Sequence, residues 1–238
     1  MFYVQCVRGD STYGTNSLKA NGDSTVSDQN TNLMWQQEDN GIGVDWETAL
    51  SGCENSSTGG HQDWRLPNAK ELHSIVDYSR SPDTTSSAAL ASIFSATGFI
   101  NEAGEADFAS YWSSSTHKSS NGHGATAVYI AFGRALGYMN SQWLDVHGAG
   151  AQRSDLKTVY DMNALDQSYS TAPTAQGGEA IIHGPQGDVI RSLNYVRCVR
   201  DDDPAADDPE EEDTDDPSTG GGNDDNVILM PVYQLLLL

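Results

Sequence analysis

The residues best suited to chemistry lie between Gly137 and Arg191, where two segments repeat one combination of polar groups. "WLDVHGAGAQRSD" (143–155) and "IIHGPQGD" (181–188) each set a His-Gly pair ahead of an aspartate. Such groups can hydrogen-bond sugar hydroxyls or hold a cation, and glycines let the backbone approach a ligand closely. The candidate ligand-binding residues are the aromatic, acidic and basic side chains of this region: Tyr138, Trp143, Asp145, His147, Arg153, Asp155, His183 and Asp188.

Two interpretations of this region are open. In the first, Trp143 or Tyr138 stacks on a pyranose ring while the polar groups bind its hydroxyls. In the second, the two loops fold onto each other through His–Asp and Arg–Asp bonds, because exposed loops must satisfy their polar groups in any case. For any single residue the second is favoured, but we expect the surface as a whole to bind a ligand.

Catalytic and metal-binding patterns are weak elsewhere in the chain. Ser113 and Ser115 precede His117, but no G-x-S-x-G elbow accompanies them. His61 and Asp63 are better explained by a turn that feeds a strand. "NGDSTVSD" at 21–28 lacks the regular oxygen-ligand spacing of a calcium loop and its distal glutamate. We therefore expect no enzyme and no cofactor; a structural calcium ion is an alternative for which no motif argues.

Two helices are expected to support this surface. "DWETALSGC" at 45–53 starts with Asp45 as its N-cap and spaces its apolar residues as one helix face, which includes Cys53. "DWRLPNAKELHSIVDYS" at 63–79 sets Pro67 before an Asn68–Glu71 capping box, which predicts a helix of about three turns. The remainder is typical of short strands between polar loops, beginning with a hairpin that turns at 29–32.

Composition separates the ends of the chain from its middle. Of the net charge of −22, thirteen acidic residues without any Lys or Arg lie in 201–226, so the rest carries −9. A surface of this sign gives no electrostatic basis for binding nucleic acid. We expect one domain over 17–200, an acidic disordered linker over 201–226, and an apolar tail over 227–238 that is either a truncated membrane anchor or a sorting segment.

The two ends of the expected domain resemble each other. "FYVQCVRGD" at 2–10 repeats the Y-V-x-C-V-R pattern of "NYVRCVRDD" at 194–202. A match of this length is improbable for two unrelated short strands. We therefore predict that residues 1–16 are the end of a preceding copy and a linker, and that the full-length protein carries this domain in tandem.

Six motifs in this order carry a family resemblance: "NLMWQ", W-x2-A-x3-C, "DWRLPNAKELHSIVDYS", "YWSSS", "VYIAFG" and "YVRCVR". Over roughly 18–200 they resemble the Lcl C-terminal domain of collagen-like bacterial adhesins, within the C-type-lectin-like and formylglycine-generating superfamily. The resemblance implies an α+β, C-type-lectin-like fold, with two helices, small twisted antiparallel sheets and long loops.

The same resemblance implies a disulfide between the first helix and the last strand, at Cys53 and Cys198. Cys6 would then be unpaired, and the compartment would be oxidising. Cys53 lies on the apolar helix face, and alternation in the last strand places Val196 and Cys198 on one sheet face, which should cover that helix. A bond requires Cα atoms about 4.4–6.8 Å apart.

The functional expectation follows from the resemblance and from two departures. The calcium-and-sugar signatures of true C-type lectins are absent, and so is the reactive cysteine of the formylglycine-generating branch. We expect a non-enzymatic adhesion module, extracellular or on the bacterial cell surface or in the periplasm, that recognises a glycan or a surface protein through 137–191. The alternatives are an oxidase-like enzyme and a structural spacer in a surface protein. A homo-oligomer is a further expectation.

Overall fold

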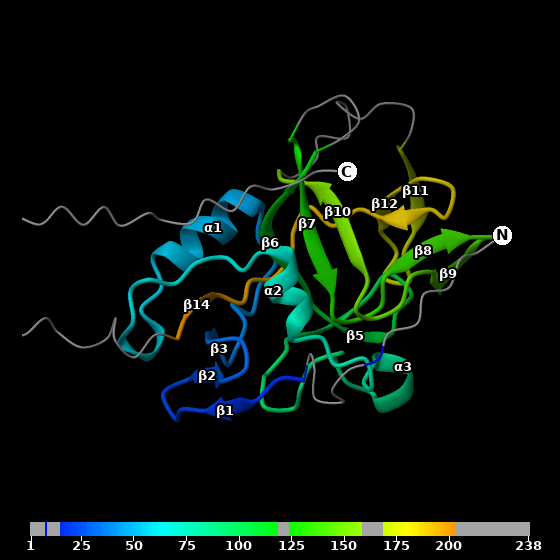
Figure 1. The fold of residues 1–238 in the computed structure, drawn as a ribbon. Helices are drawn as coiled ribbons and strands as arrows, with labels where there is room; N and C mark the ends of the chain where they lie inside the picture. Colours follow the sequence, from blue (N-terminus) through cyan, green and yellow to red (C-terminus); the bar gives the residue numbers. More distant parts are fainter. Residues whose placement is uncertain (1–7, 9–14, 119–123, 159–168, 203–238) are drawn as a thin grey trace, which may run out of the picture. The chain divides into compact units, whose positions relative to one another are not determined.

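The computed structural model describes residue 8 and residues 15–118, 124–158 and 169–202. All of them belong to the first of two units, Met1–Asp203; the second, Pro204–Leu238, lies outside the described residues. Cys6 and most of the predicted segments 1–16, 201–226 and 227–238 lie outside them as well. The described part is a mixed α+β structure with few helices and several small antiparallel sheets (Figure 1). None of its helices is long and apolar enough to cross a membrane.

The first sheet has the order β1-β2-β3-β14 and joins the two ends of the described domain. The predicted hairpin is confirmed: β2 pairs antiparallel with β3, and residues 29–32 connect them. Asp28 Oδ1 accepts hydrogen bonds from the backbone N–H groups of Ser17 and Asn30, at 2.9 and 3.2 Å, which fixes this turn. The strands of this sheet are β1 (Leu18–Ala20), β2 (Thr25–Asp28), β3 (Leu33–Gln36) and β14 (Val199–Asp201).

Helix α1 (Trp46–Glu54) starts at the predicted cap, where Asp45 Oδ1 accepts from the Thr48 N–H at 2.8 Å. Its buried residues are Ala49 and Cys53, as the periodicity predicts. The Cys53–Cys198 disulfide that the resemblance implies is present, with a Cα–Cα distance of 5.5 Å. The bond lies in a buried apolar cluster: Met34, Ala49, Trp64, Leu66, Trp112, Ala127, Tyr129 and Val196.

Helix α2 (Ala69–Ser74) has the predicted capping box, because Asn68 Oδ1 accepts from the Glu71 N–H and Glu71 Oε2 accepts from the Asn68 N–H. At six residues it is shorter than the three turns the sequence predicts. Ile75 leaves the helical region at φ −96° and ψ 3°, and Val76 forms a β-bridge with Leu90 instead of continuing the helix. Two further elements break the two-helix expectation: the 3-10 turn η1 (Thr58–Gly60) and the short helix α3 (Pro82–Thr85).

A three-stranded sheet with the order β10-β7-β6 forms the centre of the domain and is buried on both faces. Tyr111 and Ile130 face one apolar cluster, whereas Trp112 and Tyr129 face the cluster of the disulfide. Helix α2 packs against β6 and β7, which places the capped junction at the core. The strands are β6 (Ser110–His117), β7 (Thr126–Ala131) and β10 (Gln152–Leu156), and a two-stranded ribbon of β4 (Gly98–Ile100) and β5 (Ala106–Phe108) lies beside them.

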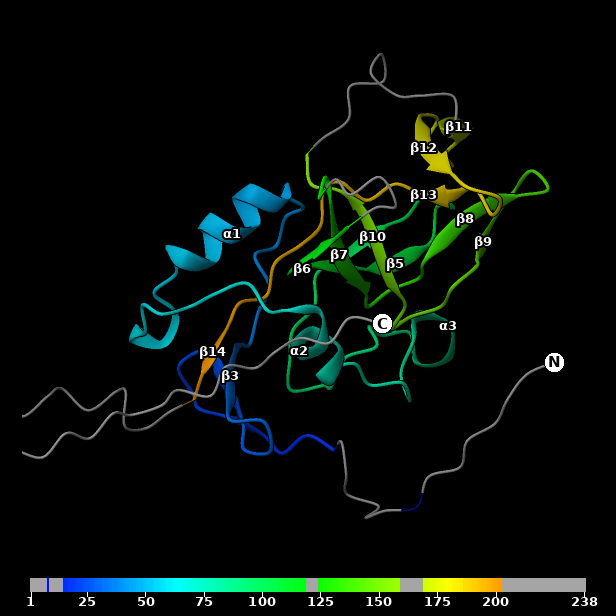
Figure 2. The same ribbon diagram turned by 45° about the horizontal axis from the view of Figure 1, so that its top comes forward.

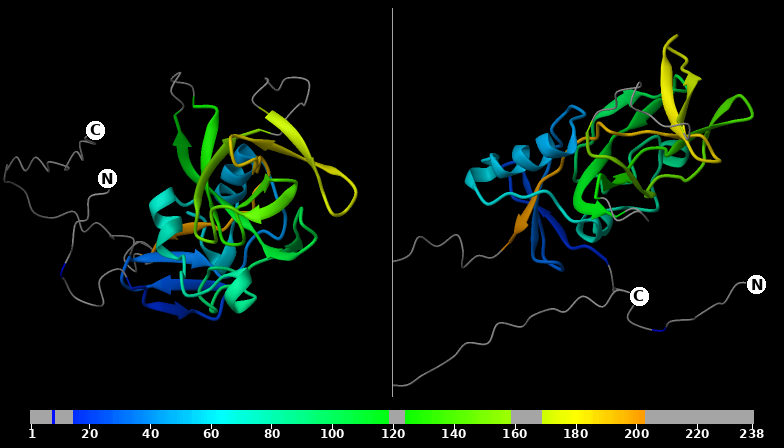
Figure 3. Two further views of the ribbon diagram at one scale, coloured as in Figure 1. Left: turned by 90° about the vertical axis from the view of Figure 1, so that its right-hand side faces the viewer. Right: turned by 90° about the horizontal axis from the view of Figure 1, so that it is seen from above.

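Of the described residues in the region predicted to bind a ligand, those outside β10 contribute to a five-stranded sheet with the order β11-β12-β13-β8-β9. In Figures 1 and 2 it stands at the opposite end of the domain from α1, and Figure 3 shows the hairpin of β11 and β12 projecting from the body. Its strands are β8 (Leu136–Met139), β9 (Gln142–Asp145), β11 (Tyr169–Pro173), β12 (Glu179–His183) and β13 (Asp188–Val189).

Candidate functional site

Strand register divides four of the predicted binding residues between the two faces of the five-stranded sheet. Tyr138 pairs with Trp143 across β8 and β9, so these two rings share one face. His183 pairs with Asp188, and Asp188 pairs with Gly137, the neighbour of Tyr138 in the chain. Because successive side chains of a strand point to opposite faces, His183 and Asp188 lie on the face away from the rings. The eight residues therefore form separate groups.

The aromatic pair is part of a small core. The Tyr138 and Trp143 ring centroids lie 4.9 Å apart, and both rings pack against a buried apolar cluster of Leu136, Ala172, Ile182 and Val189. Trp143 Nε1–H donates to the Pro173 carbonyl oxygen at 2.9 Å, which connects the two edge strands β9 and β11. Both rings remain partly exposed, so they stabilise the sheet and also contribute to its surface.

Asp145 holds a turn. Its Oδ1 accepts hydrogen bonds from the backbone N–H groups of Ala135 and Gly148, each at 2.9 Å. Gly148 has φ +81°, a conformation that favours glycine, and the carboxylate fixes the chain as it leaves β9. The residue is exposed, but its carboxylate is already engaged by the backbone.

The Asp188 carboxylate binds two of the predicted basic side chains. Arg153 Nη2 donates to its Oδ2, and His147 Nε2 lies 3.0 Å from its Oδ1. Arg153 comes from β10 of the central sheet, His147 from the segment after β9, and Asp188 from β13. This carboxylate therefore joins the five-stranded sheet to the body of the domain.

The Asp155 carboxylate is a second, more deeply buried centre, at 4 % exposure. Its Oδ2 accepts from the Tyr129 hydroxyl at 3.0 Å and from the Arg191 backbone N–H at 2.8 Å, while His183 Nε2 lies 3.7 Å from its Oδ1. Burial raises the pKa of Asp155, against the opposing effect of these donors and of the nearby charges. Each aspartate thus pairs with the histidine of the other sequence segment.

Two residues that the sequence did not single out extend this network. The Arg191 guanidinium binds Glu102 through both oxygens, at 2.5 and 2.8 Å. Although burial raises the pKa of Glu102, the charge and hydrogen bonds of Arg191 outweigh that effect and hold it below its usual value. A buried ion pair between residues 89 positions apart leaves no local pattern in a sequence, so only the fold reveals it.

The network leaves the outer edges of three side chains accessible. His147, Arg153 and His183 are 22 %, 23 % and 32 % exposed at their side chains. Held in this way, Arg153 can donate hydrogen bonds to a ligand and each histidine can offer its second ring nitrogen, without losing much side-chain entropy on binding. Within the ranges 15–118, 124–158 and 169–202, no group of three or more His, Cys, Asp or Glu residues is arranged to hold a metal ion.

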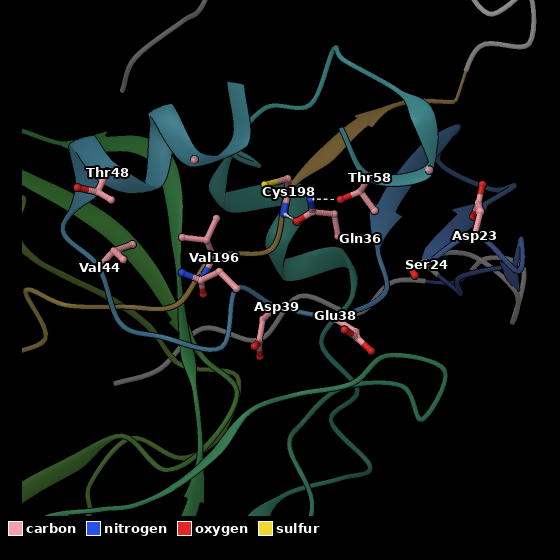
Figure 4. A pocket seen from close by; sticks show the side chains of 13 residues that line it. Asp23, Ser24, Gln36, Glu38, Asp39, Val44, Thr48, Thr58, Val196 and Cys198 are labelled. Atoms are coloured by element: carbon pink, nitrogen blue, oxygen red, sulfur yellow. Dashed lines mark hydrogen bonds between the residues drawn. The ribbon is translucent and has the colours of Figure 1, made fainter. Parts of the chain in front are cut away.

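A separate pocket of about 580 Å³ lies between α1, η1, the segment that follows β3 and the segment before β14 (Figure 4). None of the eight predicted residues lines it. Its lining comes from five separate segments of the chain, brought together by the four-stranded sheet and the disulfide: Asp23, Ser24, Gln36, Glu38, Asp39, Asn40, Val44, Thr48, Gly52, Thr58, Gly59, Val196 and Cys198.

These features define a class: a disulfide-linked α+β domain whose first helix is covalently joined to the segment just before its last strand and whose far end carries a projecting sheet. The family model of the Lcl C-terminal domain matches residues 24–147, slightly more than half of the 238 residues. The chain therefore belongs to the Lcl C-terminal domain family. No curated protein and no solved structure shows significant similarity to it.

The matched range contains the hairpin, both main helices, the central β6–β7 pair, and the candidate residues Tyr138, Trp143, Asp145 and His147. Arg153, Asp155, His183, Asp188 and Cys198 lie beyond it. Family membership suggests a surface-associated domain. The partners of the later residues follow from this chain's own structure.

Proposed function

We propose that this domain is a non-enzymatic binding module that works outside the cytoplasm, on a bacterial cell surface, in the periplasm or in the extracellular medium. It recognises a glycan or a surface protein through the five-stranded sheet. The proposal is supported by membership of the Lcl C-terminal family and by the Cys53–Cys198 disulfide, since such bonds persist in oxidising compartments.

One observation carries the assignment to this sheet. The edge strand β9 is not covered by any other described strand, and it presents Trp143 and the 42 % exposed Leu144. Apolar side chains and fixed polar groups are the chemistry that sugars and protein partners use, since the first supply contact area and the second supply orientation. Trp143 supplies area on one face of the sheet, and Leu144 lies on the face of Asp188, to which Arg153 and His147 bind. The polar network holds this sheet to the body, so the surface is formed before a ligand arrives.

The finer fold assignment belongs to the same proposal. A C-type-lectin-like fold is supported by the pairing of β14 with β3 and by the covalent link from α1 to the segment before β14. In this interpretation the sheet of β8, β9 and β11–β13 occupies the place of the long-loop ligand surface of that superfamily.

The oxidase-like and spacer alternatives require different structural features. An enzyme of the formylglycine-generating type needs a reactive thiol, and both described cysteines are joined in the disulfide. A spacer needs no specific surface, so changes on β9 would leave every interaction unaltered.

A glycan array and a screen against surface proteins, both with the full chain, test the proposal. Trp143→Ala and Leu144→Ser should each weaken binding of the best ligand, because they remove apolar contact area from β9. Ile42→Ser is the matched control: Ile42 is 62 % exposed and lies before α1, at the other end of the domain. Equal binding by all three variants, or no ligand in either screen, would favour the spacer.

A further inference from the structure

The pocket beside α1 is a cavity that the proposed function does not use. At about 580 Å³ it lies within the range of ligand sites, roughly 300–1,000 Å³. Figure 4 shows it as elongated, with Val44 and Thr48 near one end and Asp23 and Ser24 near the other. An elongated shape suits an extended chain better than a compact molecule.

One part of the lining is apolar and rigid. Val196 and Cys198 are 4 % and 3 % exposed, and Val44 lies beside them. Cys198 is held by its disulfide, and Gln36 Oε1 accepts from its backbone N–H at 3.2 Å. Val44 is fixed by reciprocal backbone hydrogen bonds with Asn194. This part offers van der Waals contact to an aliphatic chain and does not need to rearrange.

The remaining lining is acidic and hydroxylic. Among the residues that the structure describes, it includes the carboxylates of Asp23, Glu38 and Asp39, and no Lys, Arg or His. The Asp39 carboxylate already has several hydrogen bonds. It accepts from the backbone N–H and the hydroxyl of Thr97, and from the Tyr111 hydroxyl at 2.7 Å. The buried Arg197 contacts the same hydroxyl at 3.3 Å and balances that charge.

Glu38 differs from Asp39, because its side chain is exposed and makes no hydrogen bond or ion pair with any other residue that the structure describes. Asp23 Oδ1 accepts from the Thr25 hydroxyl at 2.6 Å, and this bond lowers the pKa of Asp23, so the carboxylate is ionised at neutral pH. Within the part of the chain that the structure describes, neither carboxylate pairs with a Lys or Arg, and the nearby His61 lowers the pKa of Asp23 further.

We propose that this pocket binds a lysine side chain presented by an extended segment of a partner protein. The aliphatic stem of lysine lies against Val196, and its ammonium group reaches the carboxylate of Glu38; Asp23, farther along the pocket, adds to the negative potential. Lysine combines an apolar stem with a charged head in this way at many partly buried sites. The ammonium is also the smallest of the protein cations, with three donors that match carboxylates and hydroxyls such as that of Thr48.

The test uses the full chain and two short peptides, N-acetylated and C-amidated Gly-Lys-Gly-Lys-Gly and the same peptide with both lysines Nε-acetylated. Binding is measured by titration calorimetry at low and at physiological salt. The lysine peptide should bind, and the acetylated peptide should not, because it keeps the stem and loses the charge. Equal binding of both peptides would overturn the proposal.

The acidic run at 201–226 also attracts cations, so the protein variants must separate it from the pocket. Asp23→Asn/Glu38→Gln removes two charges from the pocket, and Asp215→Asn/Asp216→Asn removes two from the run. The pocket variant should lose about fivefold in affinity, as expected for one exposed ion pair and one longer-range attraction, and the other variant less than about twofold. Equal losses, or no binding by the wild-type chain, would refute the site.

This proposal does not depend on the glycan or surface-protein ligand proposed above. Trp143→Ala should leave lysine-peptide binding unchanged, and Asp23→Asn/Glu38→Gln should leave binding at the β9 surface unchanged. If Trp143→Ala also abolished peptide binding, the peptide would occupy the five-stranded sheet and the pocket would not be its site.

Discussion

The disulfide gives the largest stability effect that can be worked out from the structure. Cys53 and Cys198 are 145 residues apart. In the loop-entropy model, a cross-link over such a loop stabilises the folded state by about 5 kcal/mol, as an upper figure; native disulfides of secreted domains give about 2–5 kcal/mol. Because both residues are buried in the cluster that also contains Trp64 and Trp112, the bond closes the loop without exposing apolar surface.

The stabilisation by the disulfide is best measured by comparing oxidised and reduced protein, because reduction breaks the bond without replacing either cysteine. A Cys6→Ser protein is unfolded in urea with and without a phosphine reductant, and the buried tryptophans report unfolding by fluorescence. We expect the reduced form to lose about 2–5 kcal/mol of unfolding free energy. Peptide mapping of the oxidised form checks that Cys53 and Cys198 are joined. A loss below about 1 kcal/mol, or a mapped bond to Cys6 in the wild-type chain, would refute the reasoning.

Three smaller perturbations test individual contacts. Asn68→Ala removes the cap of α2 and should cost about 1 kcal/mol in urea unfolding. The hydrogen bond from Arg200 lowers the pKa of Asp63 below 3.8 in the folded state. The stabilisation from this ion pair is therefore present above pH 3.8 and is lost as the pH falls through the lower folded pKa. Between pH 5 and 3, the unfolding free energy of Asp63→Asn should fall less steeply than that of the wild-type protein. Gly137→Ala places a Cβ 2.4 Å from a backbone carbonyl oxygen and should destabilise by about 1–3 kcal/mol, whereas Gly178→Ala, with 3.5 Å of room, should not.

Features that depend on a few consecutive residues could be predicted from the sequence. The hairpin turn at 29–32, the cap at Asp45, the capping box of Asn68 and the buried side of Cys53 all rest on spacings within one or two turns of chain. The length of α2 could not be predicted in the same way. Ile75 and Val76 continue the helical pattern, but a tertiary β-bridge to Leu90 competes for the backbone of Val76 and wins.

The pairing of the predicted site residues shows a different limit. In the sequence His147 precedes Asp155 and His183 precedes Asp188. In the structure the partners are exchanged, so that His147 faces Asp188 and His183 faces Asp155. The reason is the strand order, because β13 pairs with β8. Asp188 therefore lies near β10 and near the segment after β9, where Arg153 and His147 bind its carboxylate.

The hydrogen bonds and ion pairs around Asp155 and Asp188 also explain how these side chains can stabilise the fold while their neighbours remain able to contact a ligand. Each aspartate is held by donors from other segments, so neither can move to meet a ligand without breaking buried contacts that cost free energy. The histidines and Arg153 differ, since part of each side chain remains exposed while one atom is anchored. A ligand on one face of this sheet is therefore expected to meet the anchored polar side chains, and a ligand on the other face the Trp143 ring. A ligand that needs a free carboxylate finds one in the pocket beside α1, at Glu38.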